Sequence, residues 1–185
     1  MPPDFARALE SLRAARLRPE VRVTEVPAPA RIAPFSLALT ADVLGPPTTD
    51  EDLASGRFVL LHDPDSPDPW GGSWRAVTFA RAELEAEFAS DPLLGEVGWT
   101  WLIEALDRRG LRFVAEAGTV TRVVSESFAG LRDRPPTVEI EIRASWTPLD
   151  PDLRGHFEAW TELLCTVAGL PPLPEGVVAL PGRRR

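Results

Sequence analysis

The sequence contains no Lys, Tyr, Asn or Gln, and only one Cys and two His occur among its 185 residues. Without Lys, the chain can form neither a GxxxxGK(S/T) phosphate-binding loop nor a Schiff base, and the GxGxxG and GxSxG motifs are also missing. The single Cys165 can form neither an internal disulfide bond nor a CxxC metal motif. A secreted disulfide scaffold, a zinc ribbon, nucleotide binding by the standard motifs and a nucleophile-elbow hydrolase are therefore excluded.

Long apolar segments and basic surfaces are missing as well. No apolar run approaches the 18 residues of a membrane span, and the N-terminus lacks the continuous apolar core of a signal peptide. The formal net charge is −8, whereas a protein that binds duplex nucleic acid needs a basic stripe to displace counterions. The only basic cluster, residues 183–185, is typical of a solvated tail. We therefore expect a cytoplasmic protein with neither a nucleic-acid nor a membrane partner.

The composition that remains is that of a globular protein. Apolar residues make up 44% of the chain and charged residues 26%, which are ordinary values for a folded domain. The length predicts one domain over residues 1–169, followed by an extended Pro-rich tail over 170–185. The abundance of Arg, Ala, Pro and Gly is typical of a GC-rich genome.

Alternating apolar and polar residues predict strands over 35–43 and 137–147. The continuous apolar run 58–61 predicts a strand that is buried on both faces. A two-stranded hairpin is expected around Ala117-Gly118, because apolar residues alternate on both sides of this pair.

Three helices and one short helical segment are predicted between these strands. Asp4 is expected to cap the first helix, and residues 81–89 to form the short one. Asp91 is expected to cap a central, largely buried helix that runs to about Arg109 and contains Trp101 as a core residue. A last helix follows Asp150 or Asp152 and stops at Gly169. This order predicts an α+β fold with a largely antiparallel sheet of about six to seven strands and helices packed on one face.

The two histidines are the clearest candidates for catalysis. His62 ends a strand and leads into a loop, where catalytic groups are often presented, and Asp63 follows it. His156 lies near the start of the last helix. Together with Asp63 and Asp65, the two histidines could bind a metal ion or carry out acid–base chemistry near neutral pH. The alternative is that His62 pairs with a backbone group and that His156 is a helix-edge residue.

The loop after His62 is the candidate binding surface. Asp65 and Asp68 do not form a calcium loop with Asp63, because the sixth position lacks Gly and the twelfth lacks Glu. Trp70 and Trp74 flank the turn Gly71-Gly72, and an exposed indole beside an acidic loop could anchor a partner. The alternative is that both indoles close the protein's own core. Cys165, next to Leu164 on the last helix, is expected to be a small buried hydrophobe.

Six stretches, in the same order along the chain, resemble an actinobacterial family known as domain of unknown function 3000. The resemblance spans almost the whole sequence, from the first helix to AGLPP at 168–172. The six stretches are RPEV at 18–21, FVLLHDP at 58–64, WGGSWR at 70–75, DPLLGEVGWTWL at 91–102, GTVTR at 118–122 and EIRASWTP at 141–148. The resemblance implies a cytoplasmic actinobacterial protein and assigns no activity and no site residue.

Two functions from different classes remain open. The first is a non-enzymatic interaction module that binds another protein, with a homodimer as a further option and with no cofactor or metal. It is favoured because nucleophile, nucleotide and metal signatures are missing, whereas Trp residues, Pro-rich segments and an acidic surface are present. The second is a small enzyme or metal-binding protein that uses His62, Asp63 and His156.

Overall fold

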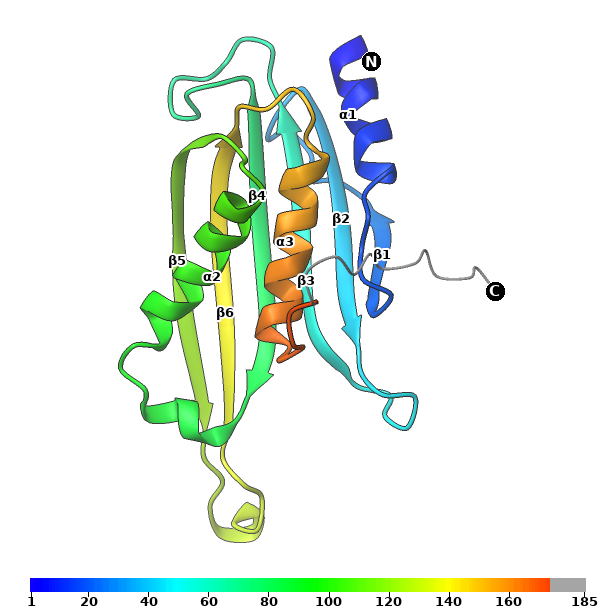
Figure 1. The fold of residues 1–185 in the computed structure, drawn as a ribbon. Helices are drawn as coiled ribbons and strands as arrows, with labels where there is room; N and C mark the ends of the chain where they lie inside the picture. The colour runs from blue at the N-terminus through cyan, green and yellow to red at the C-terminus, as the bar shows by residue number, and fades with distance from the viewer. Residues whose placement is uncertain (174–185) are drawn as a thin grey trace.

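The computed structural model describes residues 1–173, which form three α-helices and one six-stranded antiparallel sheet (Figure 1). The helices and strands have the following bounds: α1 Pro3–Arg13, β1 Val21–Val26, β2 Phe35–Leu44, β3 Asp52–His62, β4 Trp74–Leu84, α2 Leu94–Arg108, β5 Phe113–Ser125, β6 Thr137–Pro148 and α3 Arg154–Val167. Two short 3-10 helices, η1 (Ala86–Ser90) and η2 (Ala129–Leu131), lie in connections. The strand order in the sheet is β1-β2-β3-β4-β6-β5.

All three α-helices cover the same face of the sheet, and α3 lies over its centre (Figure 1). The core between α3 and the sheet is aromatic. The Phe58 ring centroid lies 5.2 Å from that of Phe157 and 5.6 Å from that of Trp160, and Trp146 is fully buried beside them. Gly56 permits this packing, because a Cβ atom there would lie 2.7 Å from the Trp160 ring. The helix-covered face therefore holds the main hydrophobic core.

The predicted α+β class and the helices on one face are confirmed. The alternation over 35–43 and 137–147 corresponds to β2 and β6, and residues 58–61 of β3 are buried on both faces, as predicted. Gly169, with φ of +81°, follows the end of α3. None of the helices within residues 1–173 combines the length and the apolar character that a membrane crossing requires.

The predicted hairpin at Ala117-Gly118 is wrong. Residues 113–125 form the single strand β5, and a β-bulge between Val114 and Ala117 accounts for the irregularity. Gly118 is needed here because a Cβ atom would collide with the Arg143 carbonyl oxygen and the Trp99 ring. The glycine therefore marks a close backbone approach within a strand, as it does in other sheets.

The predicted helix over 81–89 is also wrong. Strand β4 continues to Leu84 because Ala80 and Ala82 keep the buried alternation and pair with both β3 and β6. Sheet pairing overrides the helix propensity of Ala, Glu and Leu in this stretch. Only the 3-10 helix η1 follows.

The predicted helix starts and the burial of the middle helix need correction. Helix α1 begins at Pro3, so Asp4 lies in its first turn and pairs with Arg7 instead of capping it. Helix α2 begins at Leu94 and buries one side only, which leaves Trp101 half-buried and not in the core. Helix α3 begins at Arg154, after both predicted cap residues. Most of the predicted tail, residues 174–185, lies outside the described part of the chain.

Candidate functional site

The face of the sheet opposite the helices is open, and its side chains form regular rows across the strands. The strand register places Val26, Ala38, Val59, Val77, Ser145 and Ala117 in one row. The same register places Thr24, Thr40, Arg57, Phe79, Arg143 and Thr119 in the next row. A mostly apolar row thus lies beside a row in which two arginines flank a phenylalanine.

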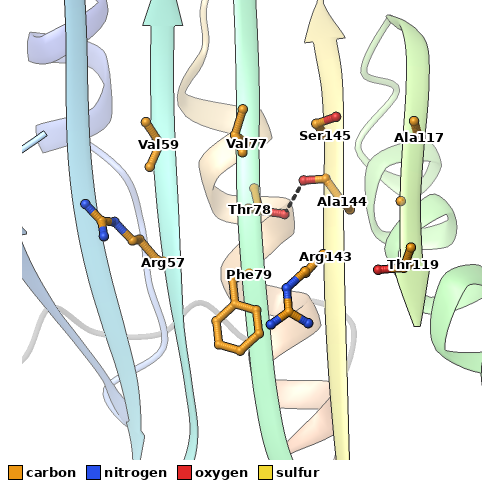
Figure 2. Close-up of a pocket in the computed structure, with 11 residues that line it drawn as sticks. Arg57, Val59, Val77, Thr78, Phe79, Ala117, Thr119, Arg143, Ala144 and Ser145 are labelled. Carbon is orange, nitrogen blue, oxygen red and sulfur yellow. Dashed lines mark hydrogen bonds between the residues drawn. The ribbon is translucent and has the colours of Figure 1, made fainter. Parts of the chain in front are cut away.

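The parts of these two rows that lie on β3, β4, β5 and β6 line a groove with a volume of about 540 Å³ (Figure 2). It is lined by Arg57, Val59, Val77, Thr78, Phe79, Ala117, Gly118, Thr119, Arg143, Ala144 and Ser145. The Thr78 hydroxyl donates a hydrogen bond to the Ala144 carbonyl oxygen at 2.9 Å, which joins β4 to β6 beneath the groove. The volume is in the range of small-molecule and peptide sites.

The charges of the groove are basic, although the protein as a whole is acidic. The Arg143 guanidinium carbon lies 4.8 Å from the centroid of the Phe79 ring, which is a cation–π contact. Arg143 also pairs with Glu141 at 2.9 Å, outside the groove lining. Arg57 donates a hydrogen bond to the Pro27 carbonyl oxygen at 3.2 Å and has no ion-pair partner within residues 1–173. The lining therefore contains two guanidinium groups and no carboxylate.

Arg75 supports the same face at the end where β5 bulges. Its guanidinium donates to Ser145 Oγ at 2.7 Å, to Thr147 Oγ1 at 3.1 Å and to the Ala115 carbonyl oxygen at 2.7 Å. Burial lowers the pKa of the Arg75 guanidinium. Because its donors are already paired with neutral groups, Arg75 holds β4, β5 and β6 together at this end.

The acidic loop that follows β3 closes one end of the open face. Trp70 is half-buried and packs on Ala38, Val59 and Leu61, a small apolar cluster on this face. Its carbonyl oxygen accepts a hydrogen bond from Thr147 Oγ1 at 2.5 Å. Since Val59 belongs to this cluster and also lines the groove, the loop surface adjoins the groove.

Trp74 lies on the opposite, helix-covered face. Its ring stacks on the imidazole of His62 with centroids 4.0 Å apart, and both rings stack on Phe5 of α1. His62 Nδ1 is 3.1 Å from the Ser73 carbonyl oxygen. The two indoles predicted to form one binding surface therefore contribute to different faces of the sheet.

The remaining loop residues follow turn geometry. Asp63 Oδ1 accepts a hydrogen bond from the Asp65 backbone N–H at 3.0 Å, and Asp68 accepts one from Gly71 through its carbonyl oxygen at 3.3 Å. Gly71 has φ of +68°, a conformation that favours glycine, and Gly72 leads the chain back into β4. Turn formation therefore explains this acidic and Gly-containing sequence.

His156 forms a separate buried network. Its Nδ1 accepts a hydrogen bond from Trp146 Nε1 at 3.0 Å, so the proton resides on Nε2, which donates to Asp150 Oδ2 at 2.8 Å. His62 and Asp63 take no part in these hydrogen bonds. Within residues 1–173, no group of three His, Cys, Asp or Glu side chains is arranged to hold a metal ion. The geometry therefore does not favour the enzyme or metal-binding function.

Burial and hydrogen bonds together set the pKa values of His156, Asp150 and Cys165. Burial lowers the pKa of His156 more than the Asp150 carboxylate raises it. Burial also raises the pKa of Asp150, but the Arg112 backbone N–H and His156 together outweigh this effect and lower it overall. Cys165 is buried, as predicted, and burial raises the pKa of its thiol to about 11. A thiol of this kind is not a nucleophile at neutral pH.

The groove residues were not among the predicted site residues. Arg57, Val77 and Phe79 lie at alternate positions of β3 and β4, and alternation predicts only that they share a face. Alternation alone does not reveal which face of the sheet the helices leave uncovered. The sequence did contain one indication of an apolar site on this face. Val77 and Phe79 are large apolar residues, and they lie on the side of β4 opposite the small residues Ala76 and Ala80.

In the comparisons with curated proteins and with solved structures, nothing matches the chain. The comparison with protein families gives one match, which confirms the resemblance predicted from the six sequence stretches. The model of the family described as "Protein of unknown function (DUF3000)" matches residues 1–178, so the chain belongs to this family.

Proposed function

We propose that this protein is a non-enzymatic interaction module that binds a segment of another protein across the open face of its sheet. The observation that carries the proposal is the groove, which has an apolar floor and contains two guanidinium groups and no carboxylate in its lining. The formal net charge of the chain is −8, so this local reversal of sign distinguishes the groove from the average surface.

The lining indicates the chemistry of the partner segment. Val59, Val77 and Phe79 offer an apolar surface for one large side chain, and Val77 is 40% exposed. Arg57 and Arg143 stand on the two sides of Phe79 in the strand register. Arginine binds carboxylates in a fork geometry while its plane stacks on an aromatic ring. A segment with an apolar anchor flanked by Asp or Glu fits both features.

The loop around Trp70 extends this surface. The Trp70 indole is only half-buried and packs on the cluster that contains Val59, a residue of the groove lining. Tryptophan and arginine are enriched among the residues that dominate binding energy at protein interfaces. Asp65 and Asp68 are exposed in the same loop and would favour a basic residue at that end of the partner segment.

A random peptide library displayed on phage and selected on the immobilised protein tests this proposal. We expect enrichment of peptides with an aliphatic or aromatic residue flanked by Asp or Glu. The double variant Arg57→Glu, Arg143→Glu should lose this acidic preference, because the charges that select carboxylates are reversed.

The matched control is Arg132→Glu, Arg134→Glu, which makes the same change of charge at exposed positions outside the groove lining. This control should keep the original preference. Enrichment of the same peptides by both double variants, or no enrichment of acidic peptides by the unaltered protein, would contradict the proposal.

A further inference from the structure

Strand β5 forms one edge of the sheet, and its outer side has no backbone partner within residues 1–173. Residues 115–125 make backbone hydrogen bonds only in the ladder with β6. An unpaired edge presents N–H and C=O groups that can pair with another chain. The opposite edge strand, β1, has six residues and is followed by Pro27 and Pro29, so it offers a shorter ladder.

The side chains of β5 fit a second strand. Beyond the bulge, residues 117–125 contain no carboxylate, and Val123 and Val124 are 38% and 42% exposed. The only charged residue of this stretch is Arg122, which donates to the carbonyl oxygens of Phe88, Ala89 and Asp91 at 2.6–3.2 Å. Within residues 117–125, two copies of this edge can therefore approach without repulsion between free charges, even though each chain is acidic; Glu116 and Glu126 lie just outside this stretch, at its two ends.

We infer that β5 pairs antiparallel with β5 of a second copy of this chain, around a two-fold axis at Thr121. Thr121 is the centre of the stretch beyond the bulge. In this register Thr119 faces the partner's Val123, and Gly118 faces the partner's Val124. Both exposed valines become covered, and Arg122 lies opposite the partner's Val120 instead of another charge. Because the same surface serves both copies, the interface closes as a dimer.

The dimer would also complete the groove. Ala117, Gly118 and Thr119 form its wall on β5, so the groove ends at the edge of the sheet in a single copy. Antiparallel pairing around an axis perpendicular to the sheet keeps both open faces on the same side. The partner's Val123 then lies beside Thr119 and extends this wall. The dimer does not depend on the proposed function, since strand pairing occurs whether or not the groove binds a peptide.

Sedimentation velocity of the full chain tests the oligomeric state. We expect a dimer, and we expect Thr121→Lys to be a folded monomer, because two Lys would face each other at the axis. Its melting temperature should fall only by the stability that dimerisation adds to the folded state. Thr24→Lys is the matched control, since Thr24 is also an exposed threonine on an edge strand, and it should remain a dimer. A monomeric parent protein, or a dimer that persists in Thr121→Lys, would overturn the inference.

Cross-linking tests the register even if a Lys variant does not fold. Single cysteines are placed by Thr119→Cys, Thr121→Cys or Val123→Cys in a Cys165→Ser background and exposed to a mild oxidant. A residue on the axis lies opposite its own copy at a Cβ separation of about 4.5–5.5 Å, so Thr121→Cys should form a disulfide-linked dimer fastest. Faster linkage at either other position, or linkage at none, would contradict the axis at Thr121.

Discussion

At the scale of single residues, the hydrogen bond from Trp146 to His156 decides how stability depends on pH. The indole N–H occupies His156 Nδ1, and burial lowers the pKa of the imidazole in the folded protein. The unfolded chain binds a proton at a pKa near 6.5. Below that pH the unfolded state therefore binds more protons than the folded state, and the free energy of unfolding falls until the pH reaches the folded pKa.

We therefore predict that the urea midpoint decreases between about pH 7.5 and about pH 5.5. His156→Gln keeps a hydrogen-bond acceptor but does not titrate, so its midpoint should vary less over this range. Asp150 does not interfere, because its pKa is lowered from an already acidic value. An equal slope in the unaltered protein and in His156→Gln would contradict the role of His156.

Cys165 gives a second prediction at this scale. With the pKa of its thiol raised to about 11 and with its side chain buried, almost no accessible thiolate exists at neutral pH. A chromogenic thiol reagent should react slowly with the native protein and fully after denaturation in urea. Rapid stoichiometric reaction without denaturant would show that the thiol is accessible or activated.

At the scale of elements, the burial of tryptophan distinguishes strand β6 from helix α2. Trp146 of β6 is fully buried, whereas Trp101 of α2 is half-buried. Trp146→Ala should destabilise the fold by about 3–5 kcal/mol, as aromatic truncation in a core does, and Trp101→Ala by roughly half as much. Urea unfolding of both variants measures the difference. Equal losses would show that α2 is packed as deeply as β6.

The loop between β3 and β4 allows a test that separates stability from binding. Trp70 covers only a small cluster, so Trp70→Ala should cost about 1–2 kcal/mol, less than truncation of a core aromatic. If Trp70 also contributes to the proposed interface, the same variant should weaken binding of the selected peptides. A melting curve and a peptide-binding titration distinguish the two effects. A stability loss with unchanged peptide affinity would remove Trp70 from the interface.

The elements that the sequence predicts correctly are those in which local pattern and tertiary environment agree. Alternation in β2 and β6 corresponds directly to one covered and one open face. The pattern is misleading at Gly118, because a glycine that allows Arg143 and Trp99 to approach resembles a turn glycine. It is also misleading at Ala82, where pairing with two strands outweighs helix propensity.

At the scale of the whole molecule, the candidate groove depends on how the helices and the sheet are layered. Local sequence patterns do not specify this arrangement. Arg57, Phe79 and Arg143 come from three strands, and only the order β3-β4-β6 places them side by side. Their exposure results from the position of all three helices on the other face (Figure 1). The sequence predicts helices on one face of the sheet, but it does not predict which apolar residues remain uncovered.

The charge of the whole molecule leads to the last prediction. With a formal net charge of −8, the protein should not bind duplex DNA specifically, because Arg57 and Arg143 neutralise too few phosphates. A gel-shift assay at about 150 mM salt should show no sequence-specific complex. Weak binding at low salt should disappear when the basic residues 183–185 are deleted. A complex that survives this salt concentration and resists competition by random DNA would contradict the prediction, and it would make the basic groove a nucleic-acid site instead of a peptide site.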